Sequence, residues 1–146
     1  MAQFSRSALV RWDGGLMDGK GTAQASSGAF SLPVSFPSRV GEPAGNTSPE
    51  ELIAAAHASC YAMAFNATLG RRGGKAAHTR ITATVTADRG EGGISIVSSR
   101  LVLSVSGLEG IEAGQLADVA HQAEQGCPVS KALRNNVNIE VEAKVE

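Results

Sequence analysis

Two cysteines are the residues of this chain best suited to chemistry, and their settings differ. Cys60 lies in a long, alanine-rich apolar stretch, so a small core residue and a reactive thiol are both open interpretations. Cys127 follows Gly126 and precedes Pro128, at a helix-to-loop junction where backbone N–H groups of the next turn can favour a thiolate, so a structural turn residue and a reactive thiol are both open. The 67-residue separation does not show whether the two meet, because a disulfide needs Cα atoms within about 7 Å.

A thiol in the middle of an apolar helix needs help to become a nucleophile. Apolar burial raises the pKa of a cysteine, and the helix dipole acts mainly in the first turn. Cys60 therefore needs a cation or a hydrogen-bond donor from another segment. His57, three residues earlier, leaves a thiol-protease arrangement open, although no orienting Asn or Asp accompanies it. His57 and Cys60 are only two ligands, and His78 and His121 are isolated, so we expect no metal.

A long helix must position Cys60. Ser48 can cap its N-terminus, Pro49 suits its first position, and Glu51 completes a capping box. The pattern predicts a helix that begins at Pro49, is mostly apolar from Leu52 to Leu69 and ends at Gly70. Because it has little polar face, we expect it to be a central buried helix or to lie in a subunit interface.

Strands are predicted in hairpin groups on both sides of this helix. They cover Ala8–Trp12, Gly19–Ala25, Phe30–Val34, Ile81–Ala87, Ile94–Val105 and Val137–Val145. Pro33 confines its strand to an edge or an end, and 36–47 reads as a loop. The apolar phase slips after Ile96 and resumes at Leu101, which indicates a bulge within 97–100.

A second helix is predicted over Ile111–Gln125, followed by a short helical turn from Pro128 to Leu133. The order βββ–α–ββ–α–β predicts an α+β fold with antiparallel sheets. With 146 residues and 42% hydrophobic content, we expect one domain over 1–146.

Composition excludes several functions. A net charge of -1 and 4% aromatic residues argue against a nucleic-acid partner. No apolar run approaches a membrane span and no signal segment is visible, so we expect a cytoplasmic protein with no membrane partner. Gly19 and Gly21 do not make a dinucleotide motif, because no helix follows them, and we expect no cofactor.

Several motifs in combination are similar to one known family. They are Trp12 with Gly19–Gly21, Arg39, the run from Thr47 to Cys60, and Gly126–Ala132. Together they resemble the osmotically inducible protein C (OsmC) family, relatives of the organic hydroperoxide resistance (Ohr) proteins. Arg39 precedes Cys60 by 21 residues, which resembles the OsmC branch.

The resemblance implies an antioxidant thiol peroxidase of the stress response that reduces organic hydroperoxides. It implies an intertwined homodimer, with the long cysteine helices between sheets and each active site at the dimer interface. Cys60 matches the peroxidatic cysteine, Cys127 the resolving cysteine, Glu50 the active-site glutamate and Arg39 its partner. A dithiol reductant, such as a lipoylated protein, is the expected electron donor.

The chemistry that the resemblance implies fits these residue types. Arg39 supplies a cation that favours the Cys60 thiolate, and Glu50 can hold the guanidinium by a bidentate pair. Cys60 becomes a sulfenic acid, and Cys127 condenses with it to a disulfide. Met63 and the nearby Phe36 or Phe65 would favour an organic peroxide over hydrogen peroxide.

Two alternatives remain open on the same fold. One is a non-enzymatic redox sensor or small-ligand carrier, which would be oxidised once without efficient recycling by a dithiol. The other is a structural dimer whose cysteines are inert and label slowly. The roles of His57 and Tyr61 also stay open between tuning the site and simple packing.

Overall fold

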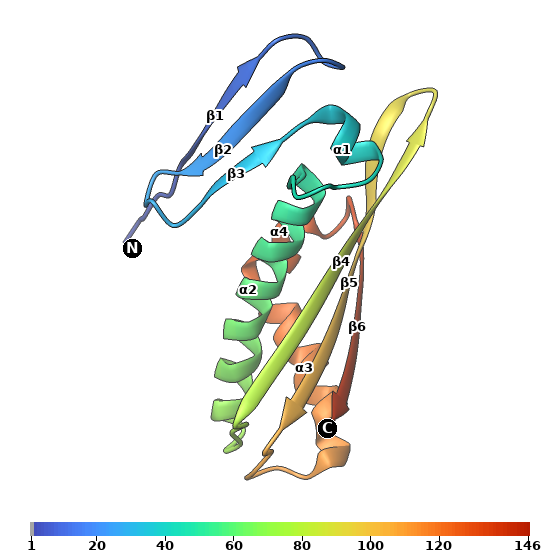
Figure 1. The fold of residues 1–146 in the computed structure, drawn as a ribbon. Coiled ribbons are helices and arrows are strands. Elements are labelled where there is room, and N and C mark those ends of the chain that lie inside the picture. The colour runs from blue at the N-terminus through green and yellow to red at the C-terminus, as the bar shows by residue number, and fades with distance from the viewer. Residues whose placement is uncertain (1) are drawn as a thin grey trace. The chain divides into compact units, whose positions relative to one another are not determined.

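The computed structural model describes residues 2–146 and divides the chain into two compact units, Met1–Leu52 and Ile53–Glu146. The elements of the first unit are β1 (Ala8–Asp13), β2 (Lys20–Ala25), β3 (Ser31–Val34) and α1 (Phe36–Val40). Helix α2 (Pro49–Arg71) crosses the boundary, and β4 (His78–Gly90), β5 (Gly93–Ser106), η1 (Ala113–Gln115), α3 (Leu116–Gly126), α4 (Pro128–Leu133) and β6 (Asn138–Val145) follow. Figure 1 shows these elements, and the predicted α+β class is confirmed.

The first unit is built on an antiparallel sheet in the order β1-β2-β3. Pro33 lies in the edge strand β3, as its missing N–H requires. Trp12 pairs with Gly21, and a Cβ added at Gly21 would lie 2.7 Å from the indole ring. One added at Gly19 would lie 2.8 Å from the indole nitrogen. The two glycines therefore let the indole lie against the hairpin.

The segment predicted as a loop over 36–47 contains a helix, so that prediction was wrong for its first part. Helix α1 begins after Ser35, whose Oγ accepts a hydrogen bond from the Ser38 N–H at 3.3 Å. Pro37 lies in the first turn, where its missing N–H costs nothing. The cap and the proline together were the overlooked signal, and the helix they start carries Arg39.

Helix α2 begins as predicted and ends later than predicted. The Ser48 Oγ accepts a hydrogen bond from the Glu51 N–H at 3.1 Å, which caps the N-terminus. The helix continues through Gly70 to Arg71. Gly73 closes it, with φ at 80° and its N–H bonded to the Gly70 carbonyl at 3.0 Å. Gly70 is therefore an ordinary residue of the helix, and Gly73, which has positive φ, ends it.

The 23 residues of α2 make it long and apolar enough to cross a membrane, which exceeds the length we expected of any apolar segment. A core helix of a soluble protein has the same composition. Tyr61, Phe65 and Leu69 of α2 are buried in the core of the second unit, whereas Met63 is 74% exposed. The helix therefore has one packed face and one open face.

The second unit has a mixed sheet in the order β4-β5-β6. Strands β4 and β5 are antiparallel as predicted, but β6 runs parallel to β5. The helices between β5 and β6 return the chain to the same end of the sheet, which makes a parallel pair possible. Thr86 pairs with Ser98 and Ala87 with Ile96, so Val97 is the extra residue of a bulge inside the predicted range.

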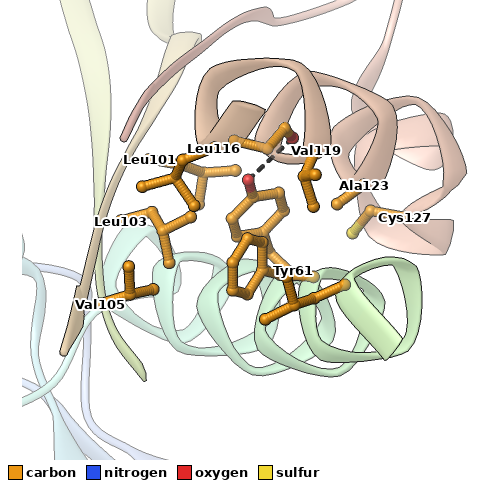
Figure 2. Packing of buried hydrophobic residues seen from close by; sticks show 11 residues of the cluster. Tyr61, Leu101, Leu103, Val105, Leu116, Val119, Ala123 and Cys127 are labelled. Carbon is orange, nitrogen blue, oxygen red and sulfur yellow. Dashed lines mark hydrogen bonds between the residues drawn. The ribbon is translucent and has the colours of Figure 1, made fainter. Parts of the chain in front are cut away.

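The core of the second unit lies between the sheet, α2 and α3 (Figure 2). Its buried members are Tyr61, Phe65, Leu69, Leu101, Leu103, Val105, Leu116, Val119, Ala120, Ala123 and Cys127. Leu116, Val119, Ala120 and Ala123 form the buried apolar face of α3. The Tyr61 hydroxyl donates to the Ala120 carbonyl at 2.9 Å, which satisfies its polar end inside the core.

Candidate active site

The Cys60 thiol is partly buried on α2 and lies against two groups of the segment around the start of α4. These groups are the Cys127 side chain and the backbone N–H of Val129. Burial raises the pKa of the Cys60 thiol above its ordinary value, the Val129 N–H works in the opposite direction, and Cys127 adds to the rise. Within the second unit, a hydrogen-bond donor is therefore already in place for a Cys60 thiolate.

Cys127 is fully buried and ends α3 while it begins α4. Its N–H donates to the Glu124 carbonyl at 3.2 Å, and its carbonyl accepts from the Lys131 N–H at 3.0 Å. Both cysteines are free thiols in this structure. The fold thus brings together two thiols that the sequence separation alone could not place.

Arg39 and Glu50 form a bidentate ion pair within the first unit. The Arg39 Nε donates to both carboxylate oxygens of Glu50 at 3.1 Å, and Nη2 donates to Oε1 at 2.6 Å. The two side chains are 28% and 14% exposed. Hydrogen bonding to the guanidinium lowers the pKa of Glu50 despite its partial burial, and the carboxylate raises the pKa of Arg39. Both groups are therefore charged at neutral pH, and the guanidinium is held in one orientation.

A cleft of about 320 Å³ in the first unit reaches Arg39. It is lined by Val10, Trp12, Leu16, Ala23, Val34, Ser35, Phe36, Arg39, Thr47, Pro49 and Leu52. Of the side chains expected to favour an organic substrate, Phe36 lines this cleft. Phe65 is fully buried and belongs to the core of the second unit, because its ring packs beside Tyr61. An apolar wall beside a fixed cation can take a small organic molecule with one polar end.

His57 is fully buried and does not form the thiol-protease arrangement that the sequence left open. Its Nδ1 lies 2.7 Å from the Ser99 Oγ, and its Nε2 lies 2.8 Å from the Ser130 Oγ. Burial lowers the pKa of His57, and the nearby Glu124 carboxylate partly offsets this. The imidazole is therefore neutral at pH 7, and both of its nitrogens are occupied by serine hydroxyls.

Three groups that contact Cys60 or His57 had no role of their own in the sequence analysis: Ser99, Ser130 and the Val129 N–H. Ser99 stands two residues before Leu101, so strand alternation places it on the inward face, where a polar side chain requires a partner. That position was a signal for a buried contact. The partner itself is 42 residues away and needed the structure.

No cluster of three or more His, Cys, Asp or Glu side chains that could hold a metal occurs among residues 2–146.

Comparisons with known proteins agree with the motifs. The family model described as OsmC-like protein matches residues 41–142, a range that includes Glu50, Cys60 and Cys127 and begins just after Arg39. Peroxiredoxin OsmC of Escherichia coli is 35% identical over 136 residues, covering 92% of this chain and 94% of that protein. The organic hydroperoxide resistance protein of Xanthomonas axonopodis pv. citri is 33% identical over 122 residues, covering 82% of this chain and 83% of that protein.

Solved structures show the same fold. The organic hydroperoxide resistance protein OhrB of Bacillus subtilis superposes with a TM-score of 0.73 at 26% identity, covering 94% of this chain and 98% of that one. An organic hydroperoxide resistance protein from Elizabethkingia anophelis, at 23% identity, gives a TM-score of 0.76 over 100% of both chains. The fold, the family model and the relatives together identify this chain as a member of the OsmC family.

Proposed function

We propose that this protein is a thiol-dependent peroxidase that reduces organic hydroperoxides to alcohols. The observation that carries the proposal is the setting of Cys60, whose thiol lies against Cys127 and the Val129 N–H. A reactive thiol, a second thiol within reach and a donor for the thiolate are the parts that such a reaction needs. Relatives named peroxiredoxin and organic hydroperoxide resistance protein support the same activity.

In the first step the Cys60 thiolate attacks the terminal oxygen of the hydroperoxide. The S–O bond forms while the O–O bond breaks, so sulfur is oxidised to a sulfenic acid and the peroxide is reduced. The organic fragment leaves as an alkoxide and takes a proton to become an alcohol. Because negative charge develops on this leaving oxygen, a fixed cation beside it accelerates the step.

Arg39 is the cation that we propose for this role. Its guanidinium cannot be deprotonated in the physiological range, and Glu50 fixes it through two nitrogens. The Nε and Nη2 side of the guanidinium is thereby held by Glu50. We propose that the remaining N–H groups bind the peroxide or the thiolate. The apolar cleft that reaches Arg39 would hold the organic part of the substrate.

In the second step Cys127 attacks the Cys60 sulfur and closes a disulfide, with loss of water. A dithiol then reduces the disulfide by exchange and is itself oxidised to a disulfide, which frees both cysteines. Cys127 is fully buried, so bulky monothiols have poor access to it. We propose a small dithiol, such as a lipoyl group carried by a protein, as the electron donor.

The working form that we propose is a single-domain protomer in a cytoplasmic homodimer. The open face of α2, with Met63 74% exposed, supports a second copy as its partner. The spacing of Arg39 from Cys60 and the 35% identity to Peroxiredoxin OsmC support the OsmC branch.

Steady-state turnover of cumene hydroperoxide with a dithiol reductant tests the proposal. Cys60→Ser should abolish turnover, and Cys127→Ser should allow one oxidation of Cys60 and stop there. Ser59→Ala is a matched control, because the Ser59 hydroxyl bonds the Ala55 carbonyl at 2.7 Å and faces solvent. Full turnover by Cys60→Ser would refute the mechanism. One stoichiometric oxidation of the wild type without recycling would instead favour a redox sensor.

A further inference from the structure

A buried imidazole joins the two cysteine-bearing segments of the second unit. His57 stands three residues before Cys60 on α2, and Ser130 stands three residues after Cys127 on α4. The His57 Nε2 lies 2.8 Å from the Ser130 Oγ, and its Nδ1 lies 2.7 Å from the Ser99 Oγ on β5. All three side chains are fully buried, so these contacts link three elements inside the protein.

The arrangement leaves the imidazole no other partner. A neutral imidazole has one donor and one acceptor, and a serine hydroxyl can serve as either, so both ring nitrogens of His57 are satisfied. Neither nitrogen remains to take a proton from Cys60 or from a substrate. A fully satisfied buried polar network fixes one arrangement of the elements that it joins. His57 therefore acts as a structural clamp, a side chain that holds α2, α4 and β5 together through its hydrogen bonds, and not as a general base.

The contact between His57 and Ser130 fixes α4, the short helix that lies against Cys60. Helix α4 has six residues and carries, in its first turn, the Val129 N–H that faces Cys60. Cys127 immediately precedes it. The bond from Ser130 to His57 fixes this turn directly, next to both groups. The ion pair of Arg134 with Glu124, at 2.6 Å, lies beyond the far end of the helix and does not reach its first turn.

We propose that the contact between His57 and Ser130 positions Cys127 for disulfide formation with Cys60, and that both are positioning residues. This inference rests on the proposed function for its step. The Cys127 sulfur attacks the sulfenic sulfur of Cys60, the S–S bond forms and the S–O bond breaks. The thiol proton leaves with the hydroxide as water, and no further reactant is needed.

The first test does not use peroxide. Reduced protein is equilibrated with dithiothreitol redox buffers, and the Cys60–Cys127 disulfide is quantified by intact mass and free-thiol count. Ser130→Ala should lower the equilibrium constant for this disulfide about tenfold, because the turn next to Cys127 is then no longer held in place and the effective concentration of one thiol beside the other falls. His57→Ala should lower it at least as much, and the double variant should be no worse than His57→Ala alone, since that substitution already removes the contact with Ser130. Ser130→Thr keeps the hydroxyl, so its equilibrium constant for the disulfide should be close to that of the wild type.

Tyr61→Phe is the matched control. It removes another buried hydrogen bond of α2, from Tyr61 to the Ala120 carbonyl on α3, and leaves the contacts of α4 intact. It should destabilise the fold to a similar extent while the disulfide equilibrium stays within about twofold. An equal fall in Tyr61→Phe and Ser130→Ala would overturn the proposal, because general loosening of the core would then explain both.

The second test uses cumene hydroperoxide with dimedone present to trap sulfenic acid. Ser130→Ala should divert more of the oxidised Cys60 to the dimedone adduct and less to the disulfide than the wild type does. An unchanged partition together with an unchanged dithiothreitol equilibrium would refute the clamp. If the wild type does not react with peroxide but Ser130→Ala still shifts the dithiothreitol equilibrium, the proposed peroxidase fails and the clamp stands.

Discussion

The Glu50 carboxylate accepts three hydrogen bonds from the Arg39 guanidinium, the shortest at 2.6 Å from Nη2 to Oε1. Arg39 lies on α1 and Glu50 in the first turn of α2, so the pair ties the short helix to the start of the cysteine helix. Glu50 is consequently more than a favourable charge at a helix N-terminus. It orients the one cation that we assign to the peroxide reaction.

Replacing Glu50 by Gln should lower kcat/KM for an organic hydroperoxide about tenfold, because the Arg39 guanidinium would no longer be held in one orientation toward the charge that develops on the leaving oxygen. Stability should change little, since the pair is partly exposed. Glu51→Gln is the control: the Glu51 carboxylate accepts from the Thr47 hydroxyl at 2.9 Å and does not contact Arg39. Equal rates for wild type and Glu50→Gln would remove this pair from the mechanism.

Arg39→Ala should shift the alkylation of Cys60 to higher pH. Burial raises the pKa of Cys60 within its own unit, so a nearby cation must lower it if the thiolate is to form near neutral pH. Iodoacetamide labelling against pH, read by mass spectrometry in a Cys127→Ser background, should show a rise of about one pH unit or more. Arg11→Ala removes the same charge from β1 and serves as control. Superimposable profiles for Arg39→Ala and the parent would show that Arg39 does not act on Cys60.

The buried His57 predicts that acid destabilises the protein. Burial lowers its pKa below the ordinary value of about 6.5, so between the two values the unfolded chain binds a proton that the folded chain does not. The contribution of the neutral imidazole to the free energy of unfolding is therefore fully present above about pH 7, and it decreases as the pH falls below that value.

The measurement is the free energy of unfolding in urea from about pH 8 to about pH 5, for the wild type and His57→Gln. The advantage of the wild type should shrink toward acid, while contributions from His78 and His121 cancel in the comparison. An advantage that stays constant over this range would mean that His57 binds protons equally in both states.

Met63→Glu should weaken self-association. Met63 is 74% exposed on the open face of α2, and a carboxylate buried in an interface there would lack a partner. Sedimentation velocity should report a dimer for the wild type and more monomer for the variant. Ser95→Glu adds the same charge at an exposed position on β5 and tests whether added charge alone has that effect. A wild type that is monomeric at all concentrations would rule out the homodimer.

Much of the fold followed from local patterns. The Ser48 cap, the alternation in β4 and the bulge at Val97 depend on neighbouring residues, so the sequence displays them directly. The parallel pairing of β6 with β5 is decided by the helical connection and by the sheet edge available, which no strand pattern records. Helix α1 was missed because five residues are too few for a periodicity.

The candidate site divides in the same way. The family resemblance was enough to propose Arg39, Glu50, Cys60 and Cys127 as site residues, whereas the groups that surround them were not predictable from the sequence. The serines that hold His57 lie 42 and 73 residues from it in the sequence, and only the packing of β5 and α4 against α2 brings them to its ring.

The central claim is that Cys60 and Cys127 act as one redox pair on organic hydroperoxides. The most direct measurement adds one equivalent of cumene hydroperoxide to the reduced wild-type protein and follows intact mass and free thiols with time. Our account predicts fast loss of both thiols, an intramolecular disulfide between Cys60 and Cys127, and a slower reaction with hydrogen peroxide. Retention of both thiols in the presence of either peroxide would contradict it.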